Sequence, residues 1–550
     1  MDAHQSPTHN LSKARKIGIV IALSLALFII VLDTTLLNVL LATIIREFKT
    51  DIQSIQWVIT AYSLTLAALT ITGGRFGDLF GRKKMFVLGA IIFAIGSFIT
   101  SISTNIPTMI MGESIIEGIG AALMMPATAS LLTSNFRGHE RAVAFGVWGG
   151  IAGAASALGP VIGGFLATNY SWRWGFRINV FIAILLCIGS FIIPESRDRE
   201  EKPSLDWVGV VLCGLGLLLF VFGVIESSTY GWWTSTDPFF LGNNAYQFPL
   251  GLSIVPFSIF FGLLIVVLFI LWEINKEKLG ETPLVSMKLF KNRQYASGIL
   301  TSTVMSLSMS GIIFSIPVFL QSVRNYTALQ TGESLLPLSL VLLVVAPVGA
   351  ALSKKTSPKL LIQLGLFINI ISMIVLHFSL NVDSTTWSLA PGLALFGMGM
   401  GLVFSQINNL TLSAVSVQEA GEASGVNNTM RNVGQSLGAA IVGAILLSSL
   451  SANLISGVNQ SKVIPDNFKS TIASSISKQT SNVEFGGGAK LSQQIPQPIV
   501  AEIINIGHSA TAEADRTALL VGMLFTILGF FVSFTIPKIK KIEQNQSVAS

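Results

Sequence analysis

The chain has 550 residues, of which 51% are hydrophobic and only 11% are charged, with a net charge of +6. Soluble domains carry roughly 25% charged residues, so this chain has too few to cover several water-facing domains. The composition therefore excludes a set of soluble enzyme or scaffold domains and predicts an all-α membrane protein.

Fourteen apolar runs are long enough to cross a bilayer, because spanning roughly 30 Å of hydrocarbon takes about 20 helical residues. The first run follows a basic segment and resembles a signal peptide, but its length and the presence of Asp33 predict an uncleaved span. In chain order the runs cover residues 17–43, 54–76, 84–104, 107–133, 142–168, 174–193, 206–226, 250–272, 296–321, 330–352, 359–379, 387–414, 424–450 and 517–536.

The basic residues predict the orientation. With the N-terminus inside, the inner connecting segments hold more than twice as many Lys and Arg as the outer ones, which is the usual bias of cytoplasmic loops. We expect a multi-pass protein of the cytoplasmic (plasma) membrane with both termini in the cytoplasm and the lipid bilayer around it. The net positive charge then follows from topology, and no nucleic-acid partner is expected.

Part of the sequence repeats at an offset of 279 residues, which pairs the fourth and fifth spans with the twelfth and thirteenth. The matching pairs include Gly118 and Gly397, Glu140 and Glu419, and Gly159 and Gly438. Two parallel repeats around a midplane site are typical of a secondary transporter. The predicted parts are a cytoplasmic tail (1–16), a six-helix bundle (17–193), two inserted helices with a cytoplasmic linker (194–295), a second six-helix bundle (296–536) with an outer loop (451–515), and a cytoplasmic C-terminal tail (537–550).

The connection between the second and third spans combines glycines, one acid and a basic cluster. Glycines allow two helix ends to approach closely, and an acid beside basic residues can latch one conformation and release it in another. Each residue alone could be a turn former or a topology signal. The string matches G-x-x-x-D-x-x-G-R-[KR] and resembles the loop motif of the major facilitator superfamily, although Leu79 stands where that family usually has Arg. The candidate gate residues are Gly74, Gly77, Asp78, Gly81, Arg82 and Lys83.

The fifth span contains Gly159, Pro160, Gly163 and Gly164 among other small residues. Small residues allow close helix packing, and proline permits a bend. Helix packing alone would explain the glycines. The segment also resembles the G-P-x-x-G-G motif of exporters in this superfamily, a resemblance that implies export.

The first span carries an acid within the predicted hydrocarbon region. Leu32, Asp33, Thr35, Asn38 and Val39 are similar to the L-D-x-T-x-x-N-V signature of the fourteen-helix drug:proton antiporter family. An intramembrane Asp costs about 2.5 to 3.5 kcal/mol on insertion scales. We therefore expect Asp33 to face a wet cavity and to carry a proton. The alternative is that this carboxyl hydrogen-bonds within its own helix as a packing device.

The fourth span departs from that family, which normally has R-x-x-Q-G where this chain has Ser114, Glu117 and Gly118. Glu113 and Glu117 are four residues apart and so share a helix face. Repulsion between them should keep at least one protonated. These two carboxyls could bind a cationic substrate, take protons in addition to Asp33, or do both.

Polar residues in the second half are candidates for the lining of a central cavity. Interhelical hydrogen bonding would explain them nearly as well. Arg431 could pair with a carboxylate or form an inner gate opposite Asp78. The candidate cavity-lining residues are Asn38 in the first half and Gln406, Asn409 and Arg431 in the second half.

Motifs for other chemistries do not occur in the sequence. It has no GxxxxGK[ST] phosphate loop, no HExxH and no CxxC. Its two cysteines, Cys187 and Cys213, lie in apolar runs and read as small core residues. We expect no catalytic residues, no metal, no cofactor and no enzyme activity.

Together these features predict a major facilitator fold with two six-helix pseudo-repeat bundles and two inserted helices. The function they predict is proton-coupled export by alternating access of small lipophilic compounds, cationic ones included. The partners would be a small-molecule substrate and protons, and the working unit a monomer. Two alternatives stay open: a nutrient importer or symporter of the same fold, and a non-transporting membrane sensor or scaffold.

Overall fold

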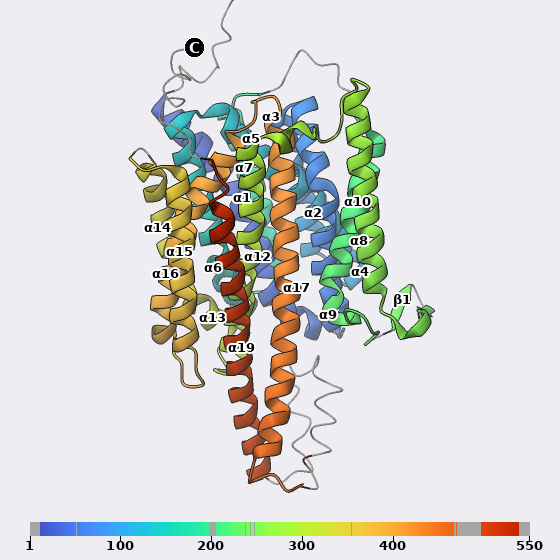
Figure 1. The fold of residues 1–550 in the computed structure, drawn as a ribbon, viewed down its shortest axis with the longest axis vertical. Coiled ribbons are helices and arrows are strands. Elements are labelled where there is room, and N and C mark those ends of the chain that lie inside the picture. Colours follow the sequence, from blue (N-terminus) through green and yellow to red (C-terminus); the bar gives the residue numbers. More distant parts are fainter. Residues whose placement is uncertain are drawn as a thin grey trace, which may run out of the picture.

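The structure is a computed structural model that describes residues 12–50, 52–196, 205–236, 238–241, 244–246, 248–353, 355–466, 469 and 497–537. Within these ranges, 13 helices are long and apolar enough to cross a membrane, and α14 adds a shorter apolar helix of 17 residues. Together they coincide with the fourteen predicted runs, which confirms the all-α membrane class. Figure 1 shows these helices running side by side along the long axis of the molecule.

Their bounds follow the chain in order. The first half contains α1 (Lys13–Phe48), α2 (Ile52–Phe80), α3 (Arg82–Ser101), α4 (Ile106–Met109), the π-helix η1 (Ile110–Glu117), α5 (Gly118–Asn135), α6 (Gly138–Asn169), α7 (Arg173–Gly189) and η2 (Ser190–Ile192). The middle contains α8 (Trp207–Ile225), α9 (Ser227–Tyr230), β1 (Phe239–Leu241), β2 (Asn244–Tyr246), η3 (Pro249–Gly251), α10 (Ile254–Lys278) and α11 (Lys288–Lys291). The second half contains α12 (Arg293–Ser322), α13 (Ala328–Ser334), α14 (Leu336–Leu352), α15 (Pro358–Ser379), α16 (Thr386–Leu412), α17 (Ala420–Gln460) and α19 (Gln497–Ser533).

Polar caps define where many of these helices begin. Asp206 caps α8 by accepting the backbone N–H of Gly209 at 3.0 Å, and Thr327 and Thr385 form capping boxes at α13 and α16. Such caps satisfy backbone donors that have no partner within the helix. The short antiparallel hairpin of β1 and β2 lies in the connection between α9 and α10, outside the helical bundle.

Equivalent contacts in the two halves confirm the internal repeat. A side chain at Gly118 would lie 2.9 Å from Thr65 in α2, and one at Gly397 would lie 2.1 Å from the carbonyl oxygen of Leu338 in α14. The second span of each half therefore packs on the same repeat position. These positions need glycine because the partner occupies the place of a Cβ atom.

A second pair of glycines repeats the pattern against the third span of each half. A Cβ atom at Gly120 would lie 2.4 Å from the backbone nitrogen of Phe93 in α3. At Gly399 it would lie 2.5 Å from the carbonyl oxygen of Gly365 in α15. The two halves thus share one packing plan, as the pseudo-repeat predicts.

Two buried apolar clusters dominate the interior. One lies mainly within residues 19–193 and the other within 305–536. The inserted helices α8 and α10 pack on each other, and α8 also packs on α2. In Figure 1 they lie at the edge of the molecule beside α2. This position agrees with an insertion between two bundles.

The predicted outer loop 451–515 is wrong in its bounds. Helix α17 continues to Gln460, and α19 already begins at Gln497. Figure 1 shows the two helices extending together beyond the other helices. Leu454 and Val458 are buried against α19 in this extension. Low hydropathy concealed the extension from the sequence, because a two-helix contact needs only one apolar stripe on each partner.

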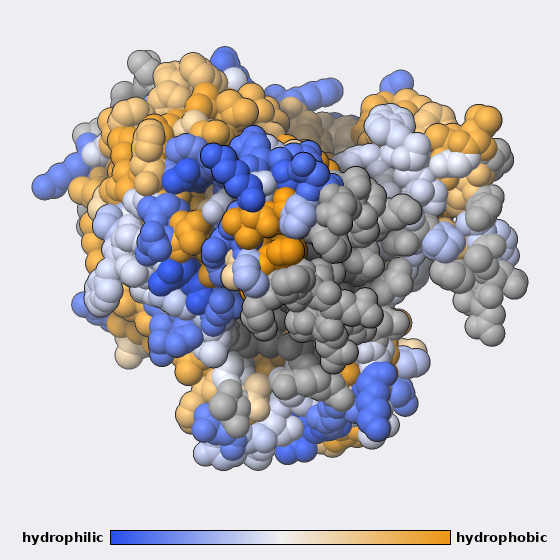
Figure 2. All heavy atoms as spheres, turned by 90° about the horizontal axis from the view of Figure 1, so that it is seen from below, coloured by the Kyte–Doolittle hydropathy of each residue, from blue (hydrophilic) through white to orange (hydrophobic). Residues whose placement is uncertain are grey.

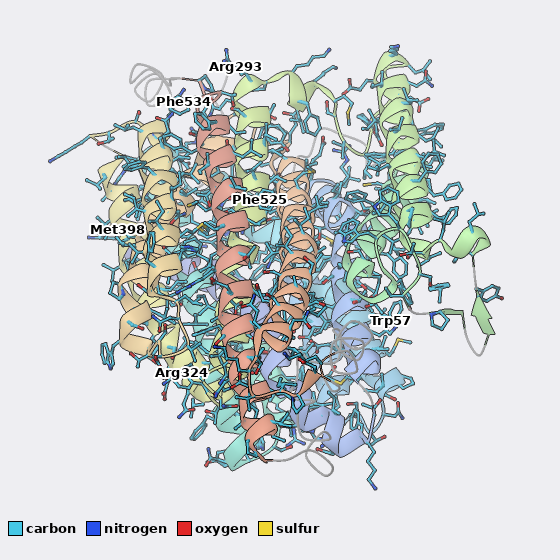
Figure 3. All side chains as sticks on the ribbon, turned by 60° about the horizontal axis from the view of Figure 1, so that its bottom comes forward. Trp57, Arg293, Arg324, Met398, Phe525 and Phe534 are labelled. Atoms are coloured by element: carbon cyan, nitrogen blue, oxygen red, sulfur yellow. The ribbon has the colours of Figure 1, made fainter. Side chains whose placement is uncertain are left out.

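The surface agrees with a membrane setting. Figure 2 shows polar residues gathered at the end with the helix extension and apolar residues along the flanks. Figure 3 shows Arg293 and Arg324, which lie near opposite ends of α12, toward opposite ends of the bundle, whereas Met398 points out from a flank. Lipid covers such an apolar flank, and charged side chains remain at the water interfaces.

Candidate functional site

Three carboxylic acids meet inside the first half. Asp33 comes from α1, and Glu113 and Glu117 come from η1. One carboxyl oxygen of each lies within 4.8 Å of those of the others, and the three residues are 0% to 1% exposed. We call these three residues the acid cluster. The structure thus brings together all the acids that the sequence singled out within the spans.

A π-helix positions two of the acids. Residues 110–117 form η1, whose wider turn places residues four apart almost above one another. Gly96 and Gly112 bring α3 against this segment, since a Cβ at Gly96 would lie 2.5 Å from the backbone nitrogen of Glu117. The Ser114 hydroxyl donates to the carbonyl of Val58 at 2.6 Å and joins η1 to α2. Serine, where the related family has arginine, therefore has a packing role here.

An amide and a hydroxyl connect the acids. The Nδ2 of Asn179 in α7 donates to Asp33 at 2.6 Å, to Ser97 at 3.2 Å and to Glu117 at 3.4 Å. The hydroxyl of Ser97 in α3 donates to Glu117 at 2.8 Å. Four elements, α1, α3, η1 and α7, therefore hold one buried polar network.

Sequence reasoning missed Asn179 and Ser97. The available signal was an amide inside the sixth apolar run, because buried polar side chains in membranes seek partners. Tyr62 of α2 is a further neighbour that interacts electrostatically with all three acids, and it is 4% exposed. Only the folded chain shows that these residues face the acids.

The acid cluster has two chemical capabilities. Oxygens of both glutamates lie within 4.8 Å of an Asp33 oxygen, and carboxyl groups this close repel each other when all are ionised, which favours a protonated member. The network can therefore hold and exchange protons. Three carboxyl oxygens within 4.8 Å also form a donor set of the type that hard cations such as Ca²⁺ prefer. The chain's own residues fit either use.

The expectation that Asp33 faces a wet cavity is not met in this structure. Asp33 is 0% exposed, and its partners come from helices of the first half. The acid cluster lies in the core of that half and not on a surface shared by the two halves. A helix-packing role within α1 alone is also incomplete, because Asn179 of α7 holds the carboxylate.

The predicted cavity-lining residues of the second half have other partners. Gln406 is 0% exposed and donates to the carbonyl of Gly349 at 3.0 Å. Asn409 accepts from Nε of Arg141 in α6 at 2.9 Å, a contact between the two halves. The side chain of Asn38 lies outside the described part of the structure. The structure does not bring Gln406 or Asn409 to the acid cluster.

Arg431 is neither the partner of a described carboxylate nor the residue opposite Asp78. Its guanidinium carbon lies 5.3 Å from the centre of the Phe404 ring, a cation–π contact between α17 and α16. Among the described residues, Asp78 has an ion pair with Arg82 instead. Neither of the two roles left open for Arg431 is found among the described residues, because Arg82, four residues beyond Asp78, occupies the position beside that carboxylate.

The loop between α2 and α3 forms a contact with α17, which we call the gate. Asp78 accepts the backbone N–H groups of Gly421 at 3.0 Å and Glu422 at 2.7 Å. These groups lie in the first turn of α17, where free N–H groups and the helix dipole favour a negative charge. Arg82 donates at 2.7 Å to Oδ1 of Asp78, the oxygen that also accepts from Gly421. The gate residues predicted from sequence therefore meet the second half.

Arg82 extends this contact across the gate. Its Nη2 donates to the carbonyl oxygens of Val417 and, at 3.1 Å, Gln418. Its Nη1 donates to Ser196 at 3.2 Å, beyond the end of α7. One guanidinium therefore joins three segments. Lys83 contributes its backbone N–H, which donates to Glu195 at 3.1 Å.

Glycines allow the backbones of the gate to approach each other closely. A Cβ at Gly74 would lie 2.3 Å from the carbonyl oxygen of Gly421. Gly81 has φ 112°, a conformation that side chains with a Cβ rarely adopt. Gly77 has only an ordinary contact with Arg82, at 3.7 Å. Gly74 and Gly81 are thus required for backbone approach and turning, whereas Gly77 is not.

A second ion pair reinforces the gate. Arg75 lies 3.9 Å from Glu422, and both side chains are nearly buried. Glu422 also accepts the backbone N–H of Ser286 at 2.5 Å, in the connection between α10 and α11. The inserted helices are therefore tied to the same closed end.

The exporter-like motif in α6 lies where that helix meets α1 and α13. A Cβ at Gly159 would lie 2.0 Å from the hydroxyl of Thr35, two residues from Asp33. A Cβ at Gly164 would lie 3.3 Å from the backbone nitrogen of Leu329 in α13, and one at Gly332 would contact Pro160. A Cβ at Gly163 would lie 3.3 Å from the side chain of Leu36. This segment thus connects the helix that carries Asp33 to the second half.

Known proteins share this architecture and similar sequences. The family pattern described as the Major Facilitator Superfamily matches residues 23–439. The chain is 29% identical over 436 residues to a probable actinorhodin transporter of Streptomyces coelicolor, covering 78% of this chain and 72% of that protein. It is also 29% identical to the multidrug resistance protein Stp of Mycobacterium tuberculosis, covering 79% and 76%. It is 27% identical to the riboflavin transporter RibZ of Clostridioides difficile, covering 79% and 89%.

Solved structures share the fold. The human organic anion transporter MFSD10 aligns over 94% of this chain and 99% of its own, with a TM-score of 0.58 and 12% identity. The proton:xylose symporter XylE aligns over 98% and 100%, with a TM-score of 0.58 and 11% identity. The repeat, the gate and the family match lead to one conclusion: the chain belongs to the major facilitator superfamily and is a multi-pass membrane transporter.

Proposed function

We propose that this protein is a proton-coupled exporter of small lipophilic compounds. The observation that carries the proposal is the acid cluster, in which three buried carboxyls lie together and two of them, Asp33 and Glu117, accept hydrogen bonds from Asn179. Three acids in a membrane core are costly unless they are paired or functional. Relatives that include a probable actinorhodin transporter and a multidrug resistance protein favour export.

In this proposal, transport proceeds by rocking of residues 17–193 against 296–536, with 194–295 as the inserted pair. The gate end faces the cytoplasm, as do both termini, so the gate seals the cytoplasmic side in the present conformation. Opening the gate admits substrate while the acid cluster releases protons. Protonation from the outer side then favours the return. Glycines 159 and 164 of α6 would transmit the change, because they pack against Thr35 and α13.

The free energy of proton entry is large enough to drive such export. A proton entering down about 100 mV supplies roughly 2.3 kcal/mol. This energy can move a neutral ligand about fifty-fold uphill before any pH gradient is added. One proton per cycle suffices for modest accumulation outside.

Burial favours a proton role for the acids over direct contact with substrate. Glu113 and Glu117 are 1% and 0% exposed. A bulky ligand therefore cannot contact their side chains in this conformation. A proton needs only a transient water path. We therefore assign coupling to the acid cluster, and substrate contact to the surface between the halves.

Everted membrane vesicles test the proposal. After a pH gradient is imposed, addition of ethidium, puromycin or other lipophilic compounds should dissipate the gradient in vesicles with the wild-type chain. Asp33→Asn should abolish the effect at equal expression, because an amide cannot release a proton.

The matched control is Asp515→Asn, the same change at a 0% exposed acid of α19 that lies outside the acid cluster. It should leave the dissipation in place. If Asp33→Asn transports as well as the wild type, the acid cluster does not couple transport and the proposal is wrong.

A second candidate is nutrient transport, and the similarity to the riboflavin transporter RibZ favours it. Uptake of radiolabelled riboflavin by intact cells separates the two. Accumulation inside that depends on the chain supports nutrient import, whereas drug efflux without such uptake supports export.

A further inference from the structure

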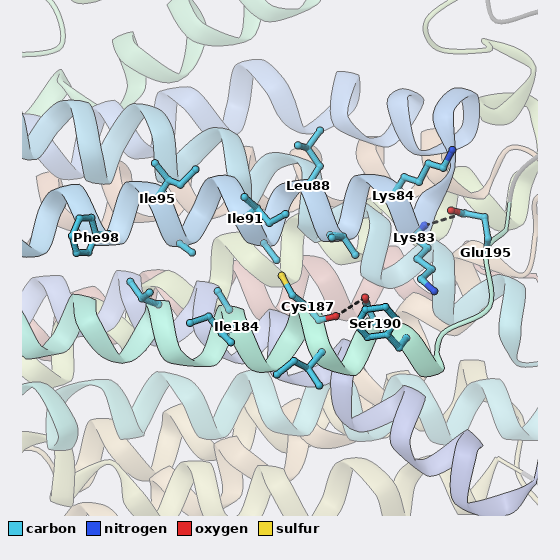
Figure 4. Close-up of a pocket in the computed structure, with 17 residues that line it drawn as sticks. Lys83, Lys84, Leu88, Ile91, Ile95, Phe98, Ile184, Cys187, Ser190 and Glu195 are labelled. Atoms are coloured by element: carbon cyan, nitrogen blue, oxygen red, sulfur yellow. Dashed lines mark hydrogen bonds between the residues drawn. The ribbon is translucent and has the colours of Figure 1, made fainter.

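An apolar groove runs along the outer face of α3 and α7. Its volume is about 1040 Å³, and its walls are almost entirely aliphatic and aromatic. Figure 4 shows Leu88, Ile91, Ile95 and Phe98 along α3 and Ile184 on the neighbouring α7, all of which line the groove. Ile91, Ile95 and Ile184 are 45%, 49% and 50% exposed. This groove is separate from the acid cluster and from the gate contacts with α17.

The length of the groove matches one leaflet of the bilayer. Its lining on α3 runs from Lys84 to Phe98, which is about 21 Å at a rise of about 1.5 Å per residue. One leaflet contributes about 15 Å of hydrocarbon, and a polar headgroup layer adds several Å more. A single lipid molecule with its acyl chains therefore fits along it.

Only one end of the groove is charged. Lys83 and Lys84 line this end, and Figure 4 shows them together with Glu195. Arg15 belongs to the same end, because its Nε donates to the carbonyl oxygen of Ile192 at 3.0 Å, next to the groove residue Phe191. Three cations against one carboxylate leave a net positive rim.

These cations have no acidic partner within the described part of the chain. The carboxylate of Glu195 accepts the backbone N–H groups of Lys83 and Ser196, so hydrogen bonds to the backbone already engage it. The neighbouring Lys16 differs, because it pairs with Glu140 at 2.9 Å. Lys84 and Arg15 are both exposed and thus available to an anion at the membrane surface.

We propose that this groove is a binding site for one anionic phospholipid of the leaflet at the gate end. The acyl chains would lie between α3 and α7, and the phosphate would lie among Lys83, Lys84 and Arg15. Basic pockets between membrane helices recognise anionic headgroups in this way. The charged rim favours a phospholipid over a neutral lipophilic compound or a second copy of the chain. The site does not depend on the proposed proton coupling.

Such a lipid would act on the gate. Lys83 follows Arg82 directly, and Glu195 precedes Ser196, which accepts from Arg82. A headgroup bound at the rim would therefore neighbour Arg82 itself and the segment of Ser196, one of those that Arg82 joins. Anionic lipid would favour the closed gate described above.

Native mass spectrometry of the purified full-length protein tests the proposal. The protein is delipidated in detergent and titrated with phosphatidylglycerol or phosphatidylcholine of identical acyl chains. We expect one phosphatidylglycerol to bind at least about 10-fold more tightly than phosphatidylcholine. Each rim cation removed should weaken this binding about 5-fold, the equivalent of about 1 kcal/mol per basic residue. Arg15→Gln and Lys84→Gln, alone and combined, are the variants.

The control pair is Lys288→Gln/Lys291→Gln, which removes the same charge from exposed lysines of α11. It should leave the lipid affinity unchanged. Ile184→Trp fills the groove without touching the rim, and it should reduce phosphatidylglycerol binding as well. Excess glycerol 3-phosphate should not displace the lipid, because the acyl chains contribute to binding.

Three results of the lipid titrations would overturn the proposal, and a fourth comes from the competition with glycerol 3-phosphate. The three are equal affinity for the two lipids, an equal loss in the α11 control, and unchanged binding in Ile184→Trp. Displacement by glycerol 3-phosphate at equal concentration would show a simple anion site and would contradict the assigned lipid.

Discussion

At the level of single residues, Asn179 links the members of the acid cluster. One amide nitrogen contacts Asp33, Ser97 and Glu117. Asp33 and the two glutamates could be singled out from the sequence, because acids within apolar spans are rare. Asn179 could not, because nothing in the chain order places it beside α1.

Asn179→Ala should impair coupling without unfolding the protein. Loss of a hydrogen bond to a charged group costs about 1.5 to 3 kcal/mol, so we expect at least a 10-fold slower substrate-driven proton flux. The measurement is dye-reported pH in everted vesicles at equal expression. Asn369→Ala changes an amide buried in the second half, and it should retain the flux. Similar losses in both variants would argue against a specific role for Asn179.

Glu47 near the end of α1 provides a pH-dependent residue outside the apolar span. Burial raises its pKa, but hydrogen bonds from Arg173 and Trp172 outweigh this effect and hold the pKa below its usual value. Arg173 Nη1 donates at 2.5 Å and Trp172 Nε1 at 2.6 Å. Because the pKa is lower in the folded state, the stabilisation is present above the unfolded pKa and is lost as pH falls through the folded one.

Glu47→Gln should therefore lower Tm at pH 7, and the difference from the wild type should shrink as the pH falls below about 4.3, the ordinary Glu value. The effect is small, below about 1 kcal/mol, because the Glu47 side chain is 43% exposed and solvent screens the pair. Thermal melts of the detergent-solubilised protein across this pH range are the measurement. A difference that grows on acidification would contradict the assignment.

At the scale of elements, the gate is a helix terminus held by a loop. Its loop motif was recognisable from the sequence, since glycine, acid and basic residues occur at fixed spacing. Its partner was not, because Gly421 and Glu422 are ordinary helix-start residues until α2 approaches them. For the same reason a place for Arg431 opposite Asp78 stayed open from the sequence.

Gly421→Ala should open the gate. The added Cβ would lie 2.4 Å from Oδ1 of Asp78 and 2.6 Å from the carbonyl oxygen of Gly74, so the closed packing cannot accommodate it. Asp78→Asn should act in the same direction by weakening charged hydrogen bonds to α17, each about 1.5 to 3 kcal/mol. We expect at least a 10-fold rise in the ratio of open to closed molecules.

Spin labels at Lys84 and Lys355, with both native cysteines replaced by alanine, would report this change as a longer interspin distance. Gly507→Ala is the matched control, because nothing lies within 4 Å of a Cβ at that position. An unchanged distance distribution in Gly421→Ala and Asp78→Asn would show that this contact does not set the closed state.

At the scale of the whole molecule, the apolar runs, the repeat and the resemblance of the motifs to a known family were together enough to predict the fold. Fourteen apolar runs and repeated glycines recovered the helices and their equivalent contacts. The extension of α17 and α19 was missed, because outside the membrane two helices need only a narrow apolar stripe, as Leu454 and Val458 show. The burial of the acid cluster within one half also required the assembled bundle.

The extension should depend on its apolar stripe. Leu454 is 6% exposed, and Leu454→Asp would bury a charge and lose a packed side chain, a change of more than about 2 kcal/mol. Hydrogen exchange should then rise in residues 451–460 and 497–510 and stay unchanged in the spans. Asn459→Asp, at an exposed site, should have little effect. Protection that survives Leu454→Asp would contradict the packing described.

The central claim is that the acid cluster takes up and releases protons during transport. Infrared difference spectroscopy of the reconstituted protein measures it directly through the carbonyl stretch of protonated carboxyl groups. The account predicts that this band weakens when pH is raised or a transported compound is added, and that the change disappears in Asp33→Asn/Glu113→Gln/Glu117→Gln. A band in the wild type that responds to neither, or one that responds equally in the triple variant, would contradict it.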